Sequence, residues 1–155
     1  MTESGRNPER RTAASTLMTA IALVAIAGIA VSSVSLYEHF ATSTTSFCNF
    51  SNSFNCDLVN RSSYSTVLGV PVALIGIVGY LLVAILATAY RNLGRTPVLL
   101  LMGSIIGFGF ALYLAYVEKF VLGVWCILCL TSLSLICIVA ALSTIATLRT
   151  RQAHV

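Results

Sequence analysis

Four long apolar stretches, separated by short polar segments, dominate the pattern of the chain. They run approximately from Leu17 to Tyr37, Val70 to Tyr90, Pro97 to Val117 and Val124 to Leu148. Each is long enough to cross the hydrocarbon core of a membrane, which takes about 20 helical residues. None contains Asp, Glu, Lys, Arg or His, so each inserts without burying a charge. The pattern therefore predicts an all-α integral membrane protein, a bundle of four transmembrane helices.

The composition agrees with this fold class. Apolar residues make up 57% of the 155 residues and charged residues only 9%, whereas soluble domains carry roughly a quarter charged residues. The net charge of +4 does not indicate nucleic-acid binding, because the nine Lys and Arg residues are scattered through short connectors. We therefore expect a lipid bilayer around the protein and no nucleic acid.

The basic residues predict an orientation, because cytoplasmic connectors retain an excess of Lys and Arg. Seven lie on one predicted side and two on the other: Arg6, Arg10, Arg11, Arg91, Arg95, Arg149 and Arg151 against Arg61 and Lys119. Both tails, residues 1–16 and 149–155, are therefore predicted to be cytoplasmic. Residues 38–69 form a long external loop, and residues 118–123 form a short one.

We predict a single transmembrane domain over residues 1–155. The basic start and small residues of the first stretch also fit a cleaved signal peptide. Its apolar run is longer than a typical signal core, and its removal would leave an odd number of spans, so an uncleaved helix fits better. Amphipathic rings settle at membrane interfaces, and Tyr37, Tyr116 and Trp125 are expected to mark the outer one.

Four of the five cysteines fall on the predicted external side. Cys48 and Cys56 lie in the long loop, and Cys126 and Cys129 form a C-x-x-C pair at the start of the fourth helix. Disulfides persist in an oxidising external compartment, and residues three apart in a helical turn are close enough to form one. The helix start lowers the pKa of a thiol, so Cys126 is expected to be the reactive one. The arrangement suggests a relay from the loop pair through the helix pair to a lipid-soluble acceptor at Cys129.

Three other interpretations of the cysteines stay open. The loop pair could be a structural disulfide in a non-catalytic four-span scaffold. The four thiolates could bind zinc, although only one pair has the usual ligand spacing. The C-x-x-C cysteines could also simply pack between helices.

Other residues near these segments have ordinary explanations. Cys137, two turns beyond Cys129, is expected to pack, because it has no partner in sequence. His39 could accept a proton near the outer mouth, although a lone interfacial histidine is more often hydrated. The acidic residues of the external segments are expected to be solvated loop charges: Glu38, Asp57 and Glu118.

The order and spacing of these residues resemble a known family. Cys48-x7-Cys56 is followed by Ser62, by Leu68-Gly69-Val70-Pro71 at the second span, and by Cys126-x-x-Cys129 at the fourth. This set resembles the vitamin K epoxide reductase family, specifically its bacterial disulfide-forming members, from the first span onward.

The resemblance implies a quinone-dependent thiol-disulfide oxidoreductase of the bacterial inner membrane, with its active site on the periplasmic side. Cys48 would exchange disulfides with a thioredoxin-like periplasmic protein, and Cys56 would pass the electrons to Cys126. Cys129 would face the acceptor, a membrane quinone of the ubiquinone or menaquinone (vitamin K) type. No metal is implied. The activity would support disulfide formation in secreted proteins.

Three further positions refine the resemblance. Ser62 matches the family's loop serine, which hydrogen-bonds near the reaction centre and would contact substrate; Ser63 and Ser65 are close enough to take that role. Animal members carry a tyrosine four residues after the second active cysteine, where this chain has Leu133, so animal-type epoxide recognition is not expected. Many bacterial members continue into a fused thioredoxin domain, whereas this chain ends at Val155, so we expect the partner to be a separate protein.

Overall fold

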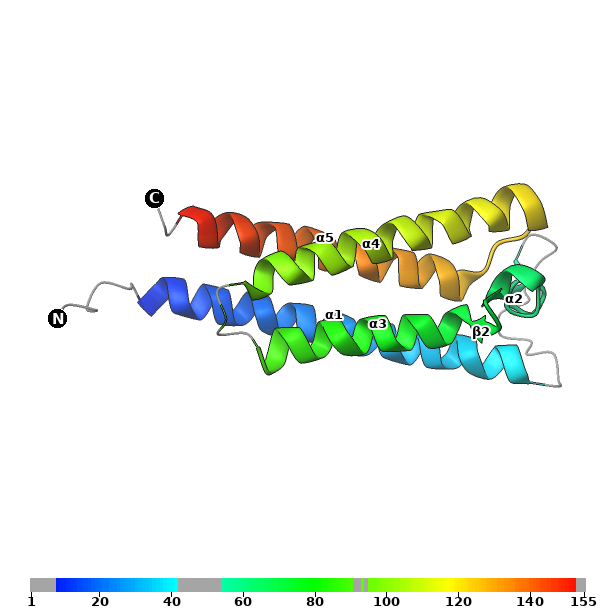
Figure 1. Cartoon of the computed structure of the whole chain (residues 1–155), viewed down its shortest axis with the longest axis horizontal. Coiled ribbons are helices and arrows are strands. Elements are labelled where there is room, and N and C mark those ends of the chain that lie inside the picture. Colours follow the sequence, from blue (N-terminus) through cyan, green and yellow to red (C-terminus); the bar gives the residue numbers. More distant parts are fainter. Residues whose placement is uncertain (1–7, 42–53, 91–92, 94, 153–155) are drawn as a thin grey trace.

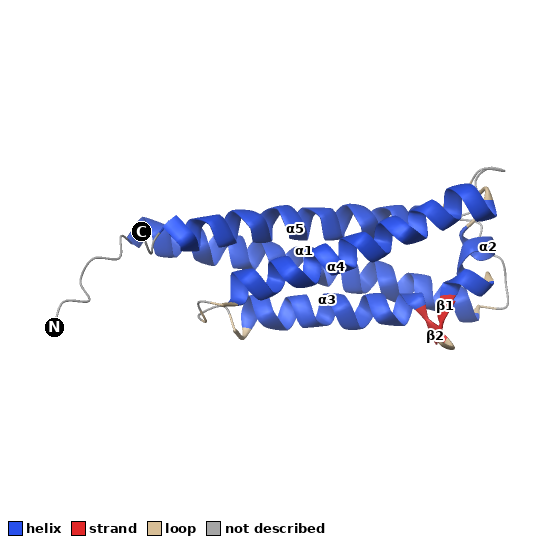
Figure 2. Ribbon diagram, turned by 45° about the horizontal axis from the view of Figure 1, so that its top comes forward, coloured by secondary structure: helices blue, strands red, loops and turns tan. Residues whose placement is uncertain are grey.

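The computed structural model describes residues 8–41, 54–90, 93 and 95–152. Four long helices lie side by side in this part of the chain (Figures 1 and 2): α1 (Pro8–Phe40), α3 (Val72–Thr88), α4 (Thr96–Val117) and α5 (Ile127–Gln152). Short elements gather at one end of the bundle: α2 (Cys56–Asn60), the 3-10 turn η1 (Ser63–Ser65), and the antiparallel strands β1 (Thr66–Val67) and β2 (Val70–Pro71). The start of α1 and the end of α5 lie at the opposite end (Figure 1).

Three helices of the described chain are long and apolar enough to cross a membrane: Thr12–Phe40, Thr96–Leu122 and Ile127–Gln152. They confirm that the first, third and fourth apolar stretches form helices of spanning length. Helix α3 has 17 residues, or about 26 Å at 1.5 Å per residue, slightly less than the hydrocarbon core of about 30 Å. Membrane crossing by the second stretch stays a prediction.

Two boundaries differ from the sequence prediction. Helix α1 continues to Phe40, so the segment predicted to form the external loop begins later than residue 38. Residues Glu118–Leu122, predicted to be a loop, instead continue α4 as a π-helical turn, η2. Gly123 ends this turn with a φ of +67°, a left-handed conformation that glycine adopts without steric cost. Short π-helical turns occur frequently at functional sites.

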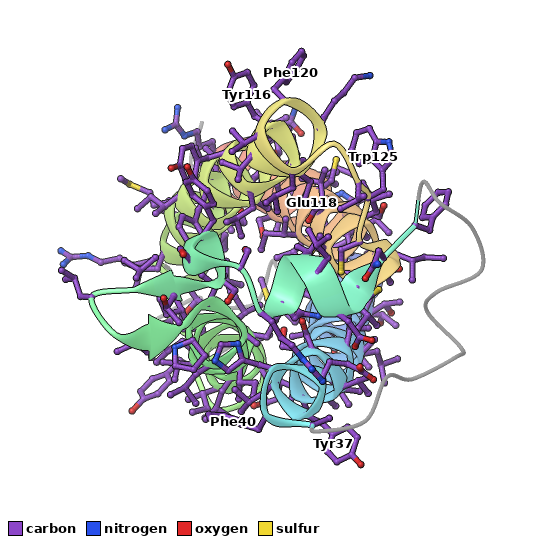
Figure 3. The ribbon with its side chains drawn as sticks, turned by 90° about the vertical axis from the view of Figure 1, so that its right-hand side faces the viewer. Tyr37, Phe40, Tyr116, Glu118, Phe120 and Trp125 are labelled. Carbon is purple, nitrogen blue, oxygen red and sulfur yellow. The ribbon has the colours of Figure 1, made fainter. Side chains whose placement is uncertain are left out.

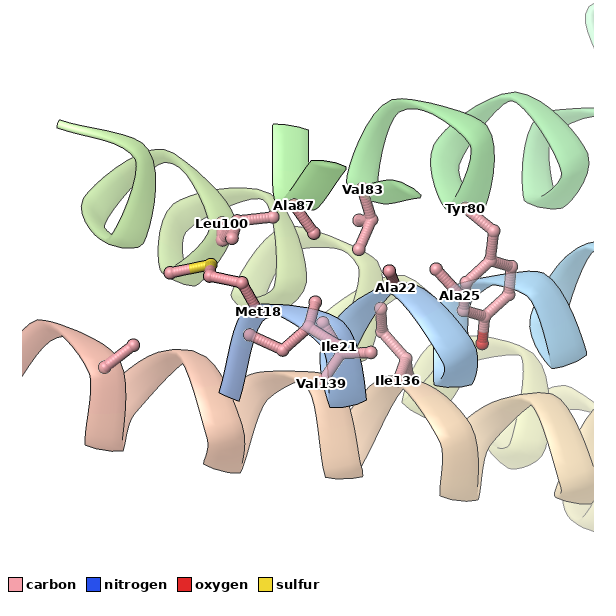
Figure 4. Close-up of a cluster of buried hydrophobic side chains, with 11 residues drawn as sticks. Met18, Ile21, Ala22, Ala25, Tyr80, Val83, Ala87, Leu100, Ile136 and Val139 are labelled. Atoms are coloured by element: carbon pink, nitrogen blue, oxygen red, sulfur yellow. The ribbon is translucent and has the colours of Figure 1, made fainter. Parts of the chain in front are cut away.

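The centre of the bundle is filled by side chains from all four long helices (Figure 4). The buried cluster consists of Met18, Ile21, Ala22 and Ala25 from α1, Tyr80, Val83 and Ala87 from α3, Leu100 from α4, and Ile136, Val139 and Ala146 from α5. The outer faces also carry large apolar side chains, including exposed Leu23, Leu82 and Ile106. Soluble monomers rarely expose so much contiguous apolar surface, so these faces are suited to lipid.

An aromatic rim surrounds the end of the bundle that carries α2. In Figure 3, which looks onto this end, Tyr37, Phe40, Tyr116 and Phe120 lie at the periphery, and all four side chains are exposed. Trp125 completes the rim, and the Nζ atom of Lys119 lies 5.5 Å from the centroid of its ring. Such rings favour the boundary between lipid and water; the interface position of Tyr37, Tyr116 and Trp125 stays a prediction.

A close contact between α1 and α3 provides a test of the packing. A Cβ atom at Gly28 would overlap the ring of Tyr80, whose hydroxyl donates to the carbonyl oxygen of Ser132 at 2.8 Å. Because the ring would have to move, we expect Gly28→Ala to lower the free energy of unfolding by about 1–3 kcal/mol. Thermal unfolding in detergent measures this effect.

Gly109→Ala is the matched control, because a Cβ atom there meets no other atom within 4 Å. This variant is expected to be as stable as the wild type or slightly more stable, since alanine favours helix. Equal melting temperatures for the two variants would contradict the packing of Gly28 against Tyr80.

Candidate active site

A short stretch of paired backbone sets two cysteines beside each other. Phe54 and Trp125 form an isolated parallel bridge, and the N–H of Asn55 donates to the carbonyl oxygen of Trp125 at 3.1 Å. The side chain of Asn55 also caps α2, which starts at the next residue. Because the paired segments run in the same direction, the residues that follow them, Cys56 and Cys126, are neighbours.

The sulfur atoms of these two cysteines are in contact. The Sγ atoms of Cys56 and Cys126 are 3.5 Å apart, and both side chains are fully buried. Cys56 is disulfide-bonded, whereas Cys126, Cys129 and Cys137 carry free thiols. Cys48, its predicted partner, lies outside the described residues. Exchange begins by attack of a thiolate on a disulfide sulfur, so this contact suits exchange between Cys56 and Cys126.

Cys126 lies directly before α5, outside the membrane-spanning helix. Its carbonyl oxygen accepts a hydrogen bond from the N–H of Leu130 at 3.0 Å. The side-chain hydrogen bond with Cys129 lowers the pKa of the Cys126 thiol below its ordinary value, although burial and the Glu118 carboxylate act in the opposite direction. The lowered pKa agrees with the sequence prediction, but its main cause is the neighbouring thiol. Cys126 and Cys129 thus form one interacting pair.

Three of the five acidic residues in the chain are buried at the end of the bundle that carries α2. Glu38 is 1% exposed, Asp57 is 8% exposed and Glu118 is 2% exposed. The prediction that they are solvated loop charges is therefore wrong. Glu38 lies within α1, Asp57 lies within α2, and Glu118 lies in the turn η2. Packing of these elements against the bundle end covers all three side chains.

Glu118 contacts the C-x-x-C pair directly. Its Oε2 atom accepts a hydrogen bond from the backbone N–H of Cys126 at 3.0 Å. A carboxylate oxygen of Glu118 and the Sγ atoms of Cys126 and Cys129 all lie within 4.8 Å of one another. Its Oε1 atom is buried and has no hydrogen-bond partner within the described chain. Sequence reasoning missed this residue; its signal is an acid placed where an apolar stretch ends, eight residues before Cys126.

An apolar cavity of about 620 Å³ extends between the long helices. Cys129 and Glu118 line it, together with Tyr80, Leu100 and Ile136 from the core of the bundle. Binding sites for small molecules have volumes of roughly 300–1,000 Å³ and are mostly apolar with a few polar groups. The cavity therefore suits an apolar molecule that is soluble in lipid.

Polar groups from α1 and the segment around α2 line the same cavity. Ser62 is among them, and its Oγ atom donates to the carbonyl oxygen of Val59 at 2.8 Å; its contact with substrate stays a prediction. His39 donates from Nδ1 to the carbonyl oxygen of Asn60 at 2.5 Å, and Ser35 donates to Oδ1 of Asn60 at 2.9 Å. The Nδ2 atom of Asn60 is buried with no partner in the described part of the chain. An unpaired donor of this kind suits a carbonyl oxygen.

The thiol of Cys137 is placed differently. It is exposed on α5, although the sequence predicted a packing role. Its free thiol and its position on the same helix make it a useful comparison for Cys129.

Cys48, one of the four thiolates of the zinc site considered from the sequence, lies outside the described residues, so the structure describes only part of that set. The group that comes together within the described chain has two cysteine sulfurs and one carboxylate, and the sulfur of Cys56 is engaged in a disulfide. A structural zinc site normally has four protein ligands. The geometry of this group is therefore better suited to thiol chemistry.

The fold and the site define a multi-pass membrane protein in which a buried thiol pair contacts a further cysteine and lines an apolar cavity. Residues 19–144 match the sequence model of the Vitamin K epoxide reductase family. The match covers most of the chain, and the chain belongs to this family. Membership supports an oxidoreductase activity in the membrane. A search of curated proteins finds no match to the chain.

Proposed function

We propose that this protein relays electrons from a thioredoxin-like protein dithiol through Cys48/Cys56 and Cys126/Cys129 to a membrane quinone. Its role is to support disulfide formation in secreted proteins. The observation that carries the proposal is the 3.5 Å contact between the Sγ atoms of Cys56 and Cys126. Cys129, next in the sequence of transfers, lines the apolar cavity. The contact supports transfer between the pairs, and the cavity supports transfer to a lipid-soluble acceptor.

The proposed chemistry consists of successive thiol-disulfide exchanges. A thiol of the partner attacks Cys48 and releases Cys56 as a thiolate. Cys56 then attacks Cys126, the cysteine that it contacts, and the bond from Cys126 to Cys129 breaks. The second thiol of the partner then releases Cys48, and Cys48 attacks Cys56 in its mixed disulfide with Cys126, which re-forms the loop disulfide and frees Cys126 as a thiol. Two electrons thereby reach the helix pair. In the structure Cys56 is disulfide-bonded and the helix thiols are free, which corresponds to the state before the helix pair gives up its electrons.

The cavity fits a quinone as the acceptor. It is large enough for a ring and the start of its apolar tail, and two of its lining residues carry buried polar atoms without partners in the described chain, Nδ2 of Asn60 and Oε1 of Glu118. Nδ2 of Asn60 would donate to a carbonyl oxygen of the ring, and Cys129 would face the ring; the carboxyl group of Glu118 could donate to it only in its protonated form. A bound quinone supplies a two-electron acceptor, and its potential relative to the partner dithiol sets the direction of transfer.

We further propose that the protein lies in the bacterial cell membrane with both termini in the cytoplasm and the site on the periplasmic side. Helix α3 would then cross the membrane beside α1. Supporting this, the start of α1 and the end of α5 lie at one end of the bundle, opposite α2 (Figure 1). Arg95, Arg149 and Arg151 lie at that same end, as expected for cytoplasmic basic residues.

The test is quinone reduction by the purified protein in detergent, with a reduced thioredoxin-like protein as donor and ubiquinone or menaquinone analogues as acceptors. Quinol formation is monitored by absorbance. We expect it only when donor and protein are both present. Failure with every quinone would remove the proposed activity. Stoichiometric zinc in the purified protein would then favour the metal-binding alternative, and its absence the scaffold.

A further inference from the structure

The relay described above does not say which group takes up or supplies the proton of Cys129, although the carboxyl group of Glu118 is buried against both helix cysteines. We propose that Glu118 exchanges a proton with Cys129, as an acid when the helix disulfide opens and as a base when it closes. This inference rests on the proposed function, because it concerns the protons that accompany the electrons of the relay.

The two oxygen atoms of Glu118 have different surroundings. Oε2 accepts the backbone N–H of Cys126 at 3.0 Å, and this bond holds the carboxyl group against the start of α5. Oε1 is buried and has no hydrogen-bond partner in the described residues. The Sγ atom of Cys129 lies within 4.8 Å of the carboxylate. Oε1 is therefore the oxygen that can carry the proton while Oε2 fixes the position of the group.

Opening the helix disulfide requires a proton at Cys129. When Cys56 attacks Cys126, the bond between Cys126 and Cys129 breaks and its electron pair goes to the Sγ atom of Cys129. The resulting thiolate would be a charge in a partly buried, apolar site, which is costly without a compensating partner. A proton from Oε1 of Glu118 converts it to a neutral thiol.

Closing the disulfide reverses this transfer. The Cys129 thiol returns its proton to Glu118 as the bond to Cys126 forms again, and two electrons leave for the quinone. Conversion to quinol requires two protons, one of which comes from Glu118 and the other from the Cys126 thiol. The two thiol protons of the partner dithiol replace them on Glu118 and Cys126 in the next round of exchange, so one dithiol becomes one disulfide for each quinol formed.

Other titratable groups lie near the cavity but not in this cluster. Within the described chain, Glu118 is the carboxyl group gathered with both helix thiols. His39 of α1 and Tyr80 of α3 also line the cavity, and both are engaged in hydrogen bonds to backbone carbonyl oxygens. Lys119 lies over the ring of Trp125. The geometry therefore favours Glu118 as the proton carrier for Cys129.

A single-turnover experiment without quinone tests the inference. Fully oxidised protein is mixed with excess thioredoxin-like dithiol, quenched with acid and alkylated, and the free thiols at Cys56, Cys126 and Cys129 are counted by mass spectrometry. We expect Glu118→Gln to slow opening of the helix disulfide by about 100-fold, the lower range for general acid catalysis. Attack of the partner on the loop pair should keep its wild-type rate. The solvent deuterium isotope effect on opening should be lost.

Two further variants separate proton transfer from structural effects. Glutamine can still accept the N–H of Cys126, and Glu118→Asp keeps a carboxyl group and should recover much of the rate even if the amide variant folds poorly. Glu38→Gln changes another buried carboxyl group at the same end of the bundle and should open at the wild-type rate. Equal slowing by Glu38→Gln and Glu118→Gln would overturn the inference.

The remaining outcomes are equally decisive. A wild-type opening rate in Glu118→Gln, or slow opening with an unchanged isotope effect, would show that Glu118 carries no proton. If the wild-type protein itself never transfers electrons from the loop pair to the helix pair, the proposed function fails first, and the inference fails with it.

Discussion

Replacing Cys129 with alanine is expected to reduce quinone turnover to background while leaving exchange between the partner protein and the loop pair intact. Cys129 is the described helix cysteine that lines the apolar cavity. Without its thiol the helix disulfide cannot close, so the two electrons cannot leave the protein. The measurement is quinol formation with a reduced thioredoxin-like donor. In parallel, trapping of the mixed disulfide reports on the first exchange.

Cys137→Ala provides the control for this prediction. It makes the same chemical change on the same helix, at a thiol that is exposed on α5. We expect its turnover to match the wild type. Comparable quinol formation by the two variants would show that Cys129 is dispensable and would favour the scaffold interpretation of the cysteines.

Replacing Cys126 with serine is expected to block transfer from the loop pair to the helix pair. Cys126 is the cysteine whose Sγ atom contacts that of Cys56 at 3.5 Å, and a serine hydroxyl cannot form a disulfide. The backbone N–H that donates to Glu118 is unchanged, so the local fold should persist. We expect the loop pair to be reduced by the partner while no quinol forms.

Peptide mapping of thiols after reaction with the donor checks this second prediction. The expected result is a reduced loop pair, a free Cys129 thiol and no disulfide at position 126. The melting temperature in detergent should stay near that of the wild type, which separates lost chemistry from lost folding. Sustained quinone turnover by the serine variant would mean that electrons reach Cys129 by a route that does not use Cys126.

These two substitutions remove reacting sulfur atoms, which explains why their expected effects are the largest. Glu118→Gln removes a proton carrier, so the reaction continues more slowly. Gly28→Ala changes the packing between α1 and α3 and removes no reacting atom, so its main effect falls on stability.

Much of the fold follows from local pattern. The absence of charges over long apolar runs predicts helices of spanning length, and α1, α4 and α5 have that length. Helix α3 begins two residues after the start of the second apolar stretch, because Val70 and Pro71 pair as strand β2 with β1. Hydropathy alone does not predict this pairing. Spacing alone also places Cys126 and Cys129 one turn apart, because neighbours in a helical turn are set by local geometry.

Contacts between distant segments decide the rest of the site. Cys56 and Cys126 are 70 positions apart in the chain, and they meet because the backbone next to each is paired, Phe54 with Trp125. The sequence predicts that Glu118, a charged residue in a short connector, is exposed. It is buried because η2 packs it against the start of α5. The cavity is a space between helices and belongs to none of them. The sequence by itself therefore determined the membrane helices and the helix cysteine pair, whereas tertiary packing decided which sulfurs touch, which acid is buried and where an acceptor can bind.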